Sequence, residues 1–167
     1  MWLTLGSARH REDDGRMDPE FAAYLERVRA HRAELGESLA ALDAALALPL
    51  GLGVLWRRRV RAALTELAHD LRDHRAITEE PGGLYADAVA RAPRLASVSK
   101  VQMDEHLDFV EIVQRLLGER DEGLESAEAV AAHRETATEL VGRIIRHRQR
   151  GADLIYEAYE VDIGGSG

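Results

Sequence analysis

Apolar residues recur along this chain at spacings of three and four, the pattern of helices that bury one face. The first stripe follows Asp18-Pro19-Glu20, a helix start with Asp as the N-cap and Pro in the first turn. The stripe ends before Pro49, Gly51 and Gly53. Its members are Phe21, Tyr24, Val28, His31, Leu35, Leu39, Leu42 and Leu46.

Three further stripes follow with the same period. One covers residues 56–77 and stops at Pro81-Gly82-Gly83. The next covers residues 95–116, and the last covers residues 130–158 and closes at Gly164-Gly165. Residues 84–90 predict a short additional helix between the second and third stripes. Long amphipathic helices joined by short connections favour an all-α fold, an antiparallel up-and-down four-helix bundle.

The chain divides into a polar N-terminal arm, residues 1–17, and one bundle domain, residues 18–165. Cysteine is absent, which excludes disulfides and thiolate metal sites. The net charge of -8 has the wrong sign for a general nucleic-acid binder. The most apolar window, residues 39–56, is interrupted by Asp43 and Pro49, whereas a membrane span needs about 20 predominantly apolar residues. We therefore expect a cytoplasmic protein without nucleic-acid or membrane partners.

Histidines occupy four positions inside the apolar stripes, one in each predicted long helix. They are His31, His74, His106 and His147. At a rise of about 1.5 Å per residue, helices of alternating direction bring them to similar heights in the bundle. Buried imidazoles need partners for both ring nitrogens, and a metal ion can satisfy several at once. The pattern predicts either a metal site or a metal-free polar core.

The chain resembles the hemerythrin-like family, the HHE cation-binding domain, over about residues 20–165. The resemblance rests on His31, on the segment from His74 to Gly83, on Glu105-His106, on His147 and on the tail from Glu157 to Gly165. It implies a non-haem di-iron centre that is held by histidines and bridging carboxylates. It also implies a protein that binds or senses dioxygen, nitric oxide or peroxide.

The carboxylates of this chain are offset from the family pattern. Thr78 stands where the family has a glutamate, and Glu79 follows it; Asp153 lies beyond the corresponding positions of the last helix. A one-residue offset rotates a side chain by about 100° around a helix. Either a local π-bulge near Gly151 and the unwinding helix end before Pro81 restore both carboxylates to a two-iron site, or the imidazoles hold one iron or zinc ion, or none.

The candidate metal ligands are thus His31, His74, Glu79, His106, His147 and Asp153. The first hypothesis is a metal-binding protein for a small diatomic or peroxide ligand. The alternatives are a di-iron oxidase or peroxidase-type enzyme, and a metal-free bundle with an interaction role. The sequence does not separate the first hypothesis from the enzyme, because both need the same ligands.

Overall fold

The computed structural model of the protein describes residues 18–120 and 124–159. The polar arm expected at residues 1–17 lies outside the described residues. The helix end expected at Gly164-Gly165 lies outside them too.

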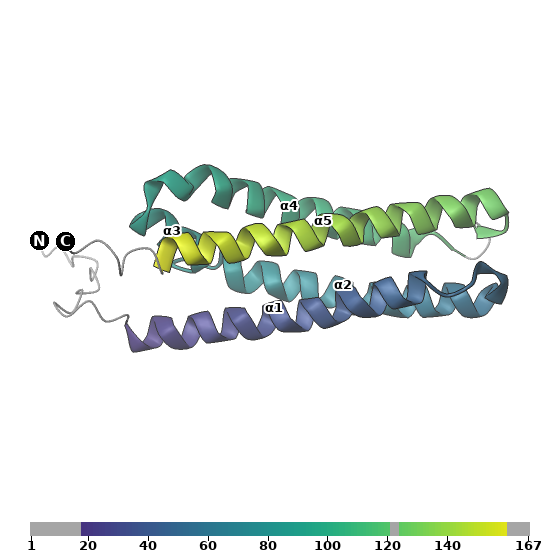
Figure 1. Ribbon diagram of the computed structural model, residues 1–167, viewed down its shortest axis with the longest axis horizontal. Helices are drawn as coiled ribbons and strands as arrows, with labels where there is room; N and C mark the ends of the chain where they lie inside the picture. The colour runs from purple at the N-terminus through teal and green to yellow at the C-terminus, as the bar shows by residue number, and fades with distance from the viewer. Residues whose placement is uncertain (1–17, 121–123, 160–167) are drawn as a thin grey trace, which may run out of the picture.

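Four long helices make up most of the described chain and lie side by side along its longest axis (Figure 1). They are α1 (Pro19–Leu46), α2 (Val54–Glu79), α4 (Ala96–Gly118) and α5 (Ala127–Tyr159). The short helix α3 (Leu84–Arg91) lies near one end of the long helices. Two 3₁₀ turns, η1 (Leu50–Leu52) and η2 (Pro93–Leu95), complete the elements. No strand occurs in the described residues, and the all-α prediction is confirmed.

The ends of the first helices follow the sequence signals. The Asp18 side chain accepts a hydrogen bond from the Glu20 backbone N–H at 3.0 Å, and Pro19 opens α1. Gly53 precedes α2 with φ 54°, a left-handed conformation that glycine adopts at little cost. Gly82, in the turn that follows α2, has φ 71°. These positions stop one helix and redirect the chain into the next.

The long helices close a ring, in which α1 packs against α2 and α5, and α4 packs against the same two helices. Their apolar side chains form two separate core clusters. The larger contains Leu35, Leu71, Phe109 and Ile144, among others. The smaller lies against α3 and contains Val28, Leu84, Leu95 and Leu154, among others. Within the described residues, no helix combines the length and apolarity needed to cross a bilayer.

A layer of polar side chains lies between these two apolar clusters along the length of the helices. Each long helix contributes to it at the point where its buried residues pass from one cluster to the other. We define the polar layer as Arg32, His74, Gln102, His106 and His147. Except for half-buried Arg32, every member is at most 4% exposed. Water is therefore largely excluded from the layer, so its polar atoms must find partners within the protein or in a bound ligand.

Candidate metal centre

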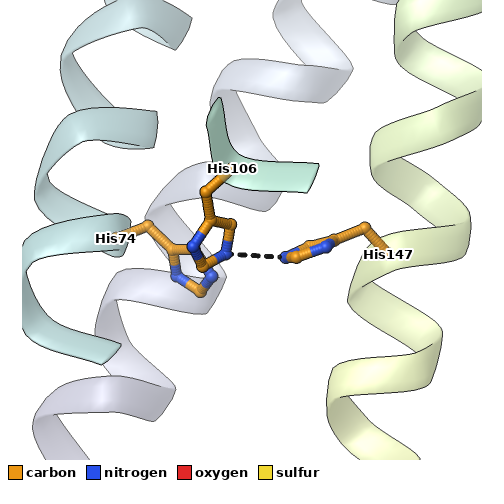
Figure 2. A group of neighbouring side chains, drawn as sticks. All are labelled: His74, His106 and His147. Carbon is orange, nitrogen blue, oxygen red and sulfur yellow. Dashed lines mark hydrogen bonds between the residues drawn. The ribbon is translucent and has the colours of Figure 1, made fainter. Parts of the chain in front are cut away.

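Three histidines of the polar layer converge at one point inside the bundle. His74 comes from α2, His106 from α4 and His147 from α5, and their rings point toward one another (Figure 2). One ring nitrogen of each lies within 4.8 Å of the corresponding atoms of the other two. The ring centroids of His106 and His147 are 4.7 Å apart, and that of His74 is 5.1 Å from that of His106. The bundle thus gathers three imidazoles from segments far apart in the sequence.

The closest contact in the cluster joins His106 Nε2 and His147 Nε2 at 3.0 Å. The opposite nitrogens face carboxylates, with His106 Nδ1 at 2.7 Å from Glu79 and His147 Nδ1 at 2.9 Å from Glu105. A carboxylate accepts hydrogen bonds, so we assign the ring proton to Nδ1 in both neutral imidazoles. Each Nε2 then carries a lone pair, and the two lone pairs face each other. A proton or a metal cation between them removes this repulsion.

Both carboxylates are themselves held by arginines. Arg75 Nε lies 3.2 Å from Glu79, one turn earlier on α2. Arg150 of α5 donates to Glu105 of α4. Each chain of contacts leads from a buried imidazole to a glutamate that is 21% exposed and then to a half-buried arginine. Metal-bound histidines commonly carry such a carboxylate on the outer nitrogen, because it fixes the ring and raises its basicity.

Burial keeps the three imidazoles neutral at neutral pH. It is the main reason that the pKa of His74 lies well below 6.5, and the neighbouring histidines lower it further. Burial and then His106 lower the pKa of His147 to about 4. Burial also lowers the pKa of His106, although Glu79 opposes the shift. Neutral imidazole is the form that coordinates metals, so the ligands need not lose protons at pH 7.

His31 lies apart from this cluster, which therefore holds three of the four histidines expected. Its side chain is 34% exposed, and Nδ1 lies 3.1 Å from Glu34 on the same helix. Arg32 occupies the position of α1 that faces the polar layer, between buried Val28 and Leu35. Spacings of three and four residues both fit a helical stripe. The sequence pattern therefore allows either His31 or Arg32 to occupy the buried face between Val28 and Leu35. The step of about 100° between them directs His31 toward the surface.

The two candidate carboxylate ligands have different environments. Glu79 reaches the site, but as the hydrogen-bond partner of His106 Nδ1. Asp153 is exposed on α5 and accepts a hydrogen bond from Gln149 at 3.0 Å. Helix α5 is continuous α-helix at Asp153, without a π-bulge that would turn this side chain inward, and Glu79 is the last residue of α2, before the turn at Pro81. The structure therefore does not bring the two carboxylates together between the histidines.

Glu105 is the residue of the centre that the sequence analysis did not assign a role. It adjoins His106 in the sequence, yet its partner is His147 on another helix. Tyr85 is a second such residue, with its hydroxyl 3.5 Å from His106 Nε2. No local pattern identifies either contact, because both depend on how separate helices pack.

The centre borders a cavity of about 10 Å³, room for a single water molecule. Comparisons of the chain with family models, with curated proteins and with solved structures found no match. The resemblance to the hemerythrin-like family is therefore an expectation from the sequence.

Proposed function

We propose that the protein binds one transition-metal ion through His74, His106 and His147 and offers it to dioxygen, nitric oxide or peroxide. The observation that carries the proposal is the contact of 3.0 Å between two Nε2 atoms whose Nδ1 atoms both face carboxylates. Two lone pairs at that distance need a cation between them. The low pKa of His147, about 4, disfavours a proton in that place at pH 7.

The separation of the two nitrogens fits a shared metal ion. Imidazole nitrogens lie about 2.0–2.1 Å from zinc, so two ligands at 90–109° are about 2.9–3.4 Å apart. The nitrogen of His74 lies within 4.8 Å of the others and completes the set after a small ring movement. His74 Nδ1 is buried without a hydrogen-bond partner, so this ring is not held by a competing contact.

A single ion agrees with the ligands better than two irons do. Two irons would bring four or more positive charges, and neutral imidazoles do not compensate them. Glu79 is engaged with His106, and Asp153 lies on the exposed face of α5. We propose iron as the resident ion, on the resemblance stated above, and zinc is the other metal that three imidazoles suit.

The residues around the ion would leave room for a small exogenous ligand. Three protein ligands leave coordination positions open, and the adjacent cavity admits a molecule about the size of water. Burial raises the pKa of Tyr85, so its hydroxyl stays protonated and can donate a hydrogen bond near His106 Nε2. A bound metal would supply the site for the diatomic or peroxide ligand.

The proposal also covers the order of the long helices in the bundle and the location of the protein in the cell. The short connections, residues 47–53 and 119–126, support an antiparallel up-and-down order of the long helices, with α3 as an end cap. We also propose a cytoplasmic protein.

Metal analysis tests the proposal directly. The protein is purified aerobically, and the metal content, the absorption spectrum and the affinity of the metal-free form for Fe²⁺ and Zn²⁺ are measured. We expect about one ion per chain, lost in His147→Ala and retained in His69→Ala, whose ring is 61% exposed beside Asp73. Folded protein that takes up neither metal would overturn the proposal in favour of a metal-free bundle. Turnover of peroxide by the iron form would instead indicate the enzyme.

A further inference from the structure

Two arginines next to the metal centre lie against the opposite helix in a reciprocal arrangement. Arg32 of α1 donates to the Arg148 carbonyl at 2.6 Å, and Arg148 of α5 donates to the Arg32 carbonyl at 3.3 Å. Each guanidinium packs against a glycine of the facing helix, Arg32 against Gly151 of α5 and Arg148 against Gly36 of α1. A Cβ atom on Gly151 would come within 3.0 Å of Arg32, and one on Gly36 within 2.7 Å of Arg148. The pair is thus fitted between the two helices.

The two positive charges have no acidic partner in the part of the chain that the structure describes. The ion pairs there do not include Arg32 or Arg148. Burial lowers the pKa of Arg32, and the charge of Arg148 lowers it further. A guanidinium has five N–H donors, and Arg148 Nε is buried without an acceptor. Half-buried like charges with unused donors are costly unless an anion compensates them.

Both arginines line the small cavity beside the histidines. Gln102, which is 1% exposed, borders it too, and its Nε2 has no hydrogen-bond partner. No carboxylate is among the described residues around the cavity, which are Arg32, His74, Tyr85, Gln102, His147 and Arg148, together with Leu84 and Gly151. The two arginines therefore bring positive charge to the cavity, and no described carboxylate that borders it offsets that charge.

We propose that this cavity is a binding site for a small monovalent anion, held by Arg32 and Arg148. The volume of about 10 Å³, room for about one water molecule, suits a single-atom anion such as a halide. A phosphate ester or nucleotide is too large. The cavity is the one that an exogenous ligand of the proposed metal would enter, but the two arginines that hold the anion are not metal ligands, so the site is tested on metal-free protein.

Bromide is the probe for the first experiment. The metal-free protein is titrated with sodium bromide by calorimetry, and the ionic strength is held constant with gluconate, which is too large for the cavity. We expect saturable binding of one bromide, and at least a tenfold loss of affinity in Arg148→Gln. Arg146→Gln is the control: it removes the same charge from an exposed position of α5 and should leave the affinity unchanged. No saturable binding, or equal losses in both variants, overturns the proposal.

A second variant separates loss of the site from loss of folding. Gly151→Ala keeps both arginines but places a methyl group 3.0 Å from Arg32 and 3.2 Å from Gln102 Oε1. Alanine favours a helix interior over glycine, so α5 should persist, and the melting temperature checks this. We expect bromide affinity to fall at least tenfold; an unchanged affinity in folded Gly151→Ala contradicts the assignment. Zn²⁺ affinity, measured separately, distinguishes failure of this site from failure of the metal site.

Discussion

His106 Nε2 and His147 Nε2 lie 3.0 Å apart at the contact between α4 and α5. Glu79 and Glu105 fix the outer nitrogens of the two rings, so the inner nitrogens present lone pairs to each other. In a buried layer from which water is largely excluded, this arrangement is costly without a cation and favourable with one. The contact therefore accounts for the predicted metal affinity, whereas the acid sensitivity of the metal-free protein follows from burial, the main cause of the low pKa of His147.

Removing one converging imidazole should remove most of the metal affinity. We expect His147→Ala to weaken Zn²⁺ binding at least a hundredfold, because two remaining imidazoles hold the ion poorly. His31→Ala is expected to leave the affinity within about twofold, since His31 pairs with Glu34 outside the cluster. Competition with a chromophoric chelator measures both values. A large loss in His31→Ala would show that α1 supplies a ligand.

Glu105 should contribute to metal affinity indirectly, because its carboxylate orients the His147 ring. Glu105→Gln removes the charge at similar size, and we expect a loss of metal affinity of about 10–100-fold. Glu111→Gln, an exposed position on the same helix, serves as the matched control. The affinity is measured by the same competition assay. Equal affinities in the two variants would mean that Glu105 has no influence on the ion.

The stability of the metal-free protein should decrease in acid. Burial, with a further contribution from His106, lowers the pKa of His147 to about 4, whereas the unfolded chain has the ordinary value of 6.5. The unfolded state therefore binds more protons between these values, and the free energy of unfolding falls as the pH falls from 6.5 to 4. The loss from this group is about 3 kcal/mol.

The pKa of Glu105 acts in the same direction at lower pH. Burial alone would raise it, but hydrogen bonds from His147 and Arg150 outweigh burial and lower it, so protonation of Glu105 also destabilises the fold. Urea denaturation between pH 7 and pH 4 measures the dependence. His147→Asn should flatten it above pH 4.5. An equally steep curve in that variant would refute the role assigned to His147.

The core beneath the centre should be sensitive to loss of volume. Phe109 is fully buried, and its ring meets the His147 ring at a centroid distance of 5.3 Å with an edge-on orientation. Phe109→Ala should lower the free energy of unfolding by about 3–5 kcal/mol because it leaves a cavity. Leu107→Ala, at a position that is 52% exposed on the same helix, should change it by less than about 0.5 kcal/mol. Chemical denaturation of both variants measures these changes in the free energy of unfolding.

The sequence by itself determined the helices and most of the imidazole cluster. Local rules apply to these features: a period of three and four locates a buried face, Asp18 and Pro19 begin α1, and Gly53 precedes α2. His74, His106 and His147 could be found because each interrupts an otherwise apolar stripe, where a polar group needs a reason to be buried.

Tertiary structure alone decided which polar side chains meet. His31 and Arg32 both fit the stripe of α1, and only the packing of the four helices directs Arg32 to the polar layer. The pairing of Glu105 with His147 joins α4 to α5, and no pattern within either helix encodes it. Helical periodicity fixes a side chain's angle on its own helix. The rotation of that helix against its neighbours follows from the packing of the whole core.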